Sequence, residues 1–170
     1  AGSGKSELGA LAITSANGSI ETHGARTLGP QSYSPAATKL LLLDGSYQTS
    51  NASLAVTTAT ATALATDNLT LSTGSGNISF AGDLLATTLG TQNLTVLSSG
   101  VTTFGGAVGN ESGLAAATFF NLFATDVGGS TRFAENATAL FFLLNDDVEL
   151  LGNLTLADVA AGGALTAAAG

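Results

Sequence analysis

The chain of 170 residues contains no cysteine, methionine or tryptophan and only 2 prolines. Because it lacks cysteine, it has no disulfide bonds, no iron–sulfur cluster and no thiol nucleophile. Charged residues make up only 9% of the sequence, whereas about a quarter is usual in globular domains. Enzymes rarely have so few charged groups, so the composition favours a structural protein over a catalyst.

Basic residues are the scarcer charged class: 4 Lys and Arg stand against 12 Asp and Glu, for a formal net charge of -8. A surface of this sign is repelled by phosphate backbones and by anionic lipid, so we expect no nucleic-acid partner. Long hydrophobic runs are missing too, because the apolar stretches at 39–43 and 139–144 fall far short of the roughly 20 residues that span a bilayer. We therefore expect no insertion into a membrane.

Candidate chemical motifs are few, and each is incomplete. Gly2–Ser6 lacks the first glycine of a phosphate-binding loop, and no strand precedes it. His23 is the only histidine, so a multi-histidine metal site is impossible, and we expect a histidine in a surface turn. Asp146–Glu149 has too few oxygen ligands for a calcium loop and is predicted to be a solvated acidic turn. We expect no catalytic residue, no metal and no cofactor.

Glycine, in contrast, is abundant, with 22 residues, and much of it falls in a repeated frame. The frame runs from Asn-Leu through glycines to Phe, and it has the same interval in Asn68–Phe80 and Asn121–Phe133. Copies begin at Ala10, Asn68, Asn93, Asn121 and Asn153, with a degenerate copy at Ala52. The intervals between the last four starts suit one coil of a β-solenoid, since repeat architectures have periods of about 20–50 residues.

Apolar residues alternate with polar ones at the start of most copies, which is the period of a β-strand. The pairs that share one parity are Leu11 and Ile13, Leu54 and Val56, Leu69 and Leu71, Leu94 and Val96, and Leu154 and Leu156. Helix signals are nearly absent, because Thr is dense and Gly interrupts almost every window. The sequence predicts an all-β protein in which these residues point into a shared interior.

We predict a parallel β-helix of about six coils, formed by residues 10–170 as a single repetitive domain and preceded by a flexible or linking segment at 1–9. Asn68, Asn93, Asn121 and Asn153 would then occupy one corner of successive coils. Their side chains could hydrogen-bond as a ladder along that corner.

One observation opposes a bare solenoid: segments 40–43, 118–123 and 140–144 carry large apolar side chains on both parities. A strand with one face in solvent cannot bury the apolar side chains of both parities. Such strands are therefore expected to be covered on two sides or to meet another subunit. The alternative fold is therefore a β-sandwich fibre subunit, in which a terminal segment completes the sheet of a neighbouring copy.

The segments 69–82 and 93–108 are similar to the repeats of large bacterial surface proteins, namely filamentous-haemagglutinin-like and autotransporter-like adhesins. The similarity is best over 68–108, fair over 10–57 and poor over 114–150. It implies a right-handed parallel β-helix and a location outside the cell or on its surface.

Sequons of the form N-x-[ST] are in excess, since about two or three are expected by chance among 10 Asn and eight are present. They lie at Asn17, Asn51, Asn68, Asn77, Asn93, Asn110, Asn136 and Asn153. The Asn-Leu-Thr copies have the ladder as a structural reason, and the remaining sites sit in polar turns. We predict an N-glycosylated surface.

Together these features predict a structural, non-enzymatic extracellular protein that builds a surface filament or adhesin stalk by end-to-end association of its own copies. Neither end of the sequence shows a polar capping repeat, and uncapped solenoid ends expose edges that can pair. The alternative is a carbohydrate- or receptor-binding module that recognises host or surface glycans by stacking sugar rings on exposed aromatic side chains. The aromatic candidates for this role are Tyr33, Tyr47, Phe119, Phe120 and Phe123. Nothing spaces them as a platform, however, and packing in the core or at an interface is the favoured interpretation.

Overall fold

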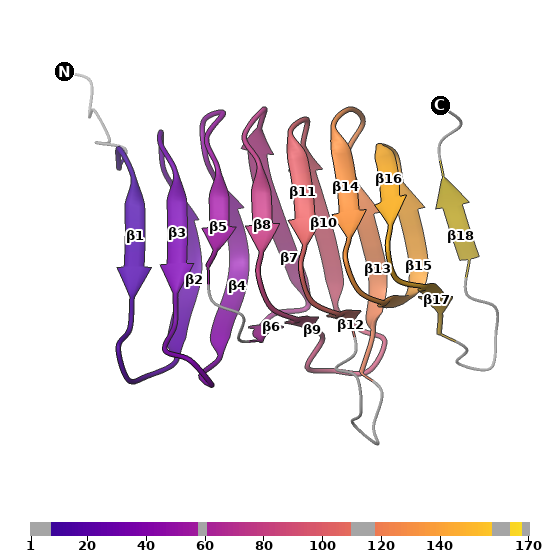
Figure 1. The fold of residues 1–170 in the computed structure, drawn as a ribbon, viewed down its shortest axis with the longest axis horizontal. Coiled ribbons are helices and arrows are strands. Elements are labelled where there is room, and N and C mark those ends of the chain that lie inside the picture. The colour runs from indigo at the N-terminus through magenta and orange to yellow at the C-terminus, as the bar shows by residue number, and fades with distance from the viewer. Residues whose placement is uncertain (1–7, 58–60, 110–117, 158–163, 168–170) are drawn as a thin grey trace.

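The computed structural model describes residues 8–57, 61–109, 118–157 and 164–167. Throughout these residues the regular elements are β-strands, and the pairings between strands are parallel. Strands from successive coils stand side by side along the long axis of the molecule (Figure 1). The predicted parallel β-helix is confirmed, and the β-sandwich alternative is wrong.

Two sheets form the walls of the solenoid. The first has seven strands, in the order β1 (Leu11–Thr14), β3 (Gln31–Ser34), β5 (Leu54–Val56), β8 (Ile78–Phe80), β11 (Val101–Phe104), β14 (Ser130–Phe133) and β16 (Asp147–Leu150). The second contains β2 (Ile20–Arg26), β4 (Leu41–Gln48), β6 (Thr62–Leu64), β7 (Asn68–Gly74), β9 (Leu84–Leu85), β10 (Asn93–Ser98), β12 (Val108–Gly109), β13 (Phe120–Thr125), β15 (Ala137–Leu144), β17 (Leu154–Leu156) and β18 (Ala164–Ala167).

The chain completes one coil each time it returns to the seven-stranded sheet. In the middle of the molecule the coil is regular, since Ile78 stands opposite Leu54 on one side and Thr102 on the other, at equal intervals along the sequence. Elsewhere the coil length changes: the step from Thr102 to Thr131 is longer, and the step from Thr131 to Val148 is shorter. Because strand lengths vary little within this sheet, turns and the second sheet absorb the difference.

The frame copies turn out to lie on different walls. Copies starting at Asn68 and Asn93 stack residue on residue in β7 and β10, and the copy at Asn121 follows them in β13 with Leu122, not Asn121, opposite Asn93. The copies at Ala10 and Ala52 belong instead to the seven-stranded sheet, as β1 and β5. Alternation identifies a strand but carries no information on which wall the strand occupies.

The interior is a continuous column of aliphatic and aromatic side chains, as predicted. Leu69 and Leu94 are 1% and 0% exposed, and Leu11 and Leu154 pack against the same core from the two ends. A row of phenylalanines continues the column through the middle coils. Phe80, Phe104 and Phe133 stack with ring centroids 5.7 and 5.4 Å apart and nearly parallel planes.

The glycines of the frame occupy the corner that leads into the seven-stranded sheet. A Cβ atom on Gly76 would lie 2.2 Å from the carbonyl oxygen of Ala52 on the previous coil. A Cβ on Gly100 would lie 2.7 Å from the carbonyl oxygen of Gly76, and a Cβ on Gly129 would lie 2.4 Å from that of Gly100. Backbone therefore rests directly on backbone at this corner, and only glycine leaves the coils free to approach.

The expectation that doubly apolar strands are covered on two sides is wrong for β15 (Ala137–Leu144). In β15, Phe142 and Leu144 point into the core, while Phe141 and Leu143 face outward and are 40% and 39% exposed. The parity of the inward residues also changes within β15. Ala137 and Ala139 are buried in its first half, whereas Phe142 and Leu144 are buried in its second half. Apolar residues on both parities can therefore each face the interior at different points of one strand.

Candidate functional site

His23 lies on an exposed wall of the solenoid, beside two carboxylates. Its Nδ1 is 3.0 Å from Asp44 Oδ2 on the next coil, and its Nε2 is 3.6 Å from Glu21 Oε1. The hydrogen bond with Asp44 raises the pKa of His23 above its ordinary value and lowers that of the Asp44 carboxyl. The predicted surface turn is wrong in one respect, since His23 belongs to strand β2 next to an irregularity before Ala25.

The acidic segment 146–149 is likewise part of a wall and not a free turn. Asp147–Leu150 forms β16, where Glu149 pairs with Arg132 at 3.3 Å on the outer surface. Asp146 accepts hydrogen bonds from the hydroxyls of Thr125 at 2.8 Å and Thr131 at 2.5 Å, which ties this corner to the preceding coil. Over the described residues, no three His, Asp or Glu side chains come together in a way that could hold a metal ion.

Asparagines form the ladder that the sequence predicts, over three coils. Asn93 Nδ2 donates to Asn68 Oδ1, and Asn121 Nδ2 donates to Asn93 Oδ1, each at 2.8 Å. Asn153 is not part of this ladder, because Leu140 holds the equivalent place on the next coil, between the pairs Phe120–Ala139 and Leu122–Phe141. The frame start at Asn153 instead follows a different corner, where its backbone N–H donates to Asn136 Oδ1 at 2.9 Å.

Other corner side chains bind the backbone of the next coil, which the sequence interpretation missed. Asn51 Oδ1 accepts from the Ser75 N–H at 3.1 Å, and Asn77 Oδ1 accepts from the Val101 N–H at 2.9 Å. Asp83 Oδ1 accepts from the Ala107 N–H at 2.8 Å. The three bonds each join residues 24 positions apart, so the coil length was the signal that could have revealed them.

The sequons are distributed over turns and corners. Asn17, Asn51, Asn68, Asn77, Asn136 and Asn153 are exposed, Asn93 is half-buried, and Asn110 lies outside the described residues. Three of the turn sequons, at Asn51, Asn77 and Asn136, use Oδ1 to bind the next coil. A structural reason for asparagine thus extends beyond the Asn-Leu-Thr copies, and glycosylation at Nδ2 stays a prediction.

Replacing Asn93 with alanine should cost about 1–2 kcal/mol, since it removes both ladder bonds and deprives the amides of Asn68 and Asn121 of their partner. The measurement is urea unfolding of unglycosylated recombinant protein. Asn17→Ala is the control, because Asn17 is exposed in a turn, and it should unfold at the same urea concentration as the parent. Equal midpoints for the two variants would mean that the ladder does not stabilise the fold.

The aromatic side chains proposed for sugar stacking are inside the solenoid. Tyr33, Tyr47, Phe120 and Phe123 are 0% exposed, and Phe119 is 6% exposed. Tyr33 and Tyr47 pack edge to face with centroids 5.8 Å apart, and the Tyr33 hydroxyl donates to Gln31 Oε1 at 3.0 Å. Burial also raises the pKa of Tyr33. These residues are core, as the favoured interpretation of the sequence expected, and the alternative in which they stack on sugar rings is wrong for them.

Described residues line open grooves on the surface of the solenoid. One, of about 310 Å³, crosses the outer face of the seven-stranded sheet beside Thr103, Arg132 and Glu149. Arg132 and Glu149 pair with each other across it, and its walls contain no aromatic side chain. It has the character of the outer surface of a sheet and not that of an enclosed ligand site.

The two end strands of the seven-stranded sheet, unlike those in its middle, have a neighbouring described strand on one side only. β1 pairs only with β3 and β16 only with β14 among the described strands, so each presents an unpaired edge. Val148 and Leu150 continue the inward columns above Thr131 and Phe133, yet they are 36% and 45% exposed. At the other end the inward residues of β1 are half-buried. We call these surfaces the β1 edge and the β16 edge.

Comparison with protein-family models, with curated proteins and with solved structures gave no match. In the described part of the chain, no helix is long and apolar enough to cross a membrane.

Proposed function

We propose that the protein is a structural, non-enzymatic component of a surface filament or adhesin stalk, built by end-to-end association of its own copies. The observation that carries this proposal is the state of the two sheet ends: both edges are unpaired among the described strands, and both leave inward-pointing aliphatic groups partly exposed to water. Covering such groups is favourable by about 25 cal/mol for each Å² removed from water.

The geometry of a parallel solenoid makes the association open-ended. All strands of the seven-stranded sheet run in the same direction, so the β16 edge of one copy can pair with the β1 edge of the next in the arrangement that already joins successive coils. This contact uses two different surfaces, and a heterologous contact whose rotation does not close produces a filament.

The remaining features agree with a scaffold role. Polar side chains of the described residues form hydrogen bonds that join one coil to the next, as in the Asn68–Asn93–Asn121 ladder and the Asp146 contacts. We also infer an extracellular or cell-surface location. It is supported by the similarity of 69–82 and 93–108 to adhesin repeats and by the exposure of most sequons in the described residues.

Lysine substitutions at single edges test the proposal by sedimentation velocity and electron microscopy. The parent should form rods that lengthen with concentration. Ile13→Lys and Leu150→Lys should each put a charge into one edge and leave the protein monomeric, while the fold tolerates both because these side chains are already partly exposed. A mixture of the two variants retains one working edge on each partner, so it should yield a dimer and nothing longer.

Thr14→Lys is the matched control, since it adds the same charge to β1 on an outward-facing residue. It should assemble like the parent. A parent that stays monomeric at every concentration would defeat the proposal, and so would an Ile13→Lys variant that forms rods as readily as the parent.

A further inference from the structure

We infer that the copies join in a single register, in which Val148 of one copy stacks over Leu11 of the next and Leu150 stacks over Ile13. This inference rests on the proposed end-to-end association and specifies its interface. The seven-stranded sheet would then run without interruption from β16 into β1 of the neighbouring copy, which enters as an additional coil.

The register follows the rule that every step of this sheet obeys. Inward residues stand over inward residues: at one end Val148 lies opposite Thr131 and Leu150 opposite Phe133. At the other end Leu11 lies opposite Gln31 and Ile13 opposite Tyr33. Joining the two ends in phase extends both columns by an aliphatic pair.

Other registers bury less apolar surface or bury charge. A slip by one residue would direct every side chain of the added strand to the opposite face, so that Glu149 would stand over an inward-facing leucine or isoleucine. A slip by two residues preserves the faces but retains only one aliphatic pair, either Val148 over Ile13 or Leu150 over Leu11. The in-phase register is the only one of these that matches both pairs.

The second sheet independently supports the same register. One inward column of this wall runs through Ile20, Leu41, Thr62, Leu84, Val108, Ala137 and Leu154. Leu154 ends the column near the β16 edge, and Ile20 begins it near the β1 edge. When Val148 stacks over Leu11, Leu154 comes to stand over Ile20, so both walls close on aliphatic contacts at once.

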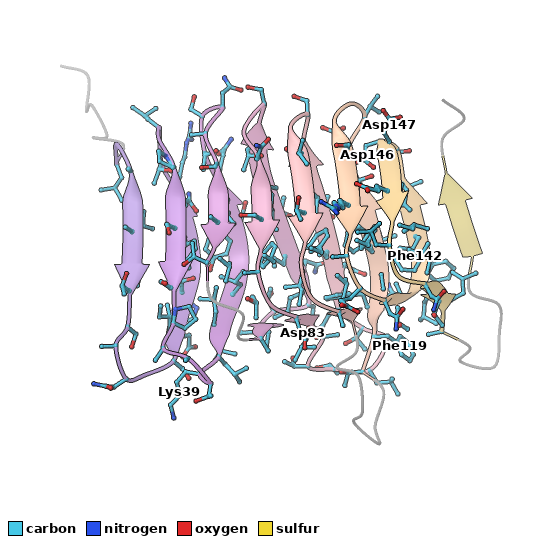
Figure 2. The ribbon with its side chains drawn as sticks, viewed as in Figure 1. Lys39, Asp83, Phe119, Phe142, Asp146 and Asp147 are labelled. Carbon is cyan, nitrogen blue, oxygen red and sulfur yellow. The ribbon has the colours of Figure 1, made fainter. Side chains whose placement is uncertain are left out.

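Charge favours joining unlike ends. The described residues 118–157 contain Asp126, Glu135, Asp146, Asp147 and Glu149 against Arg132, whereas residues 8–57 contain Glu21 and Asp44 against Arg26 and Lys39. Figure 2 shows Asp146 and Asp147 at one end of the molecule and Lys39 toward the other. Two β16 edges would bring acidic surfaces together, while a β16 edge meets a balanced surface at β1.

Engineered cysteines test the register directly, because the chain contains no cysteine of its own. Ala12 and Glu149 lie on one outward column, through Ser32, Ala55, Ser79, Thr103 and Arg132. In the inferred register they face each other across the junction, at the strand spacing of about 4.8 Å, which is within the Cα range of disulfides. Both residues are exposed, so neither substitution disturbs the core.

The experiment mixes Ala12→Cys protein with Glu149→Cys protein under mild oxidation and identifies the crosslinked peptides by mass spectrometry. A parallel mixture uses Thr14→Cys, an exposed position two residues further along β1, with the same Glu149→Cys partner. We expect the Ala12–Glu149 disulfide in several-fold higher yield than the Thr14–Glu149 one, and few disulfides between identical copies.

The other outcomes are separable. If sedimentation shows oligomers but the Thr14–Glu149 disulfide prevails, or neither mixed disulfide forms, the register is wrong while end-to-end association survives. If disulfides between two Ala12→Cys copies or two Glu149→Cys copies dominate, like ends join and the head-to-tail register is overturned. If no oligomer forms under any condition, both this register and the proposed function fail.

Discussion

Phe104→Ala should lower the free energy of unfolding by about 3–5 kcal/mol, which is the usual cost of deleting a buried phenylalanine. The Phe104 ring is 0% exposed and stacks between those of Phe80 and Phe133 at interplanar angles of 12° and 15°. It also meets Phe123 edge to face with centroids 5.5 Å apart. Alanine would leave a cavity that three other rings line, and each would lose a stacking partner.

The measurement is chemical unfolding followed by circular dichroism. Phe141→Ala serves as the matched control, since it deletes the same side chain from an outward position of β15 that is 40% exposed, and it should cost less than half as much. Phe104→Leu should fall between the parent and the alanine variant because it refills part of the volume. Equal losses for Phe104→Ala and Phe141→Ala would mean that the aromatic row does not hold the coils together.

Gly76→Ala should be damaging for the opposite reason, because it adds an atom where two coils already touch. The new Cβ would lie 2.2 Å from the carbonyl oxygen and 2.3 Å from the carbonyl carbon of Ala52. Both are backbone atoms, so relief requires the coils to separate. The Gly76 carbonyl also accepts from the hydroxyls of Thr73 at 2.6 Å and Ser98 at 2.9 Å, and a shift would weaken both bonds.

We expect a loss at or above the upper end of the roughly 1–3 kcal/mol typical of overpacking, and a fall in Tm of about 6–12 °C. Thermal unfolding by circular dichroism provides the measurement. Gly9→Ala is the control, because a Cβ there meets nothing within 4 Å. A Gly76→Ala variant that melts with the parent would show that the corner can open without cost.

Phe104 and Gly76 both lie at coil-to-coil contacts of the kind on which the proposed assembly also depends. In a solenoid each coil contacts only its neighbours, so stability is a sum of coil and interface contributions. A copy that joins at the β16 edge adds one more such interface. The net charge of -8 opposes association at low ionic strength, and salt screens that repulsion within about 10 Å at 0.1 M.

Several elements could be derived from the sequence because they depend on local rules. Alternation with a period of two identified Leu69, Leu71, Leu94 and Val96 as inward residues, and all four are buried. Repeats of about one coil length predicted the solenoid. The recurrence of Asn at the start of adjacent copies predicted the contact of Asn68 with Asn93, since equal spacing brings equal residues into register.

Other elements were missed because they depend on the exact length of every turn. Asn153 begins an Asn-Leu-Thr copy like the ladder residues Asn68 and Asn93. The coil between Thr131 and Val148 is short, however, and Asn153 lies at another corner, beside Asn136. The turn lengths also decide that Asn51, Asn77 and Asp83 accept hydrogen bonds from the backbone of the next coil, and the sequence interpretation missed these three contacts. The sequence also left open whether Phe120 and Phe123 pack in the core or stack on sugars at the surface, and both are 0% exposed.

The amino-acid sequence by itself therefore determined the strand character, the parallel stacking, the aliphatic interior and the scarcity of chemically reactive groups, since composition and a two-residue period act within a short stretch of chain. Only the tertiary structure decided which wall each strand joins, which asparagines meet, which aromatics are buried and which edges stay unpaired. Those outcomes depend on the sum of all preceding turn lengths, because a change of one residue in any coil alters the register of every residue stacked beyond it.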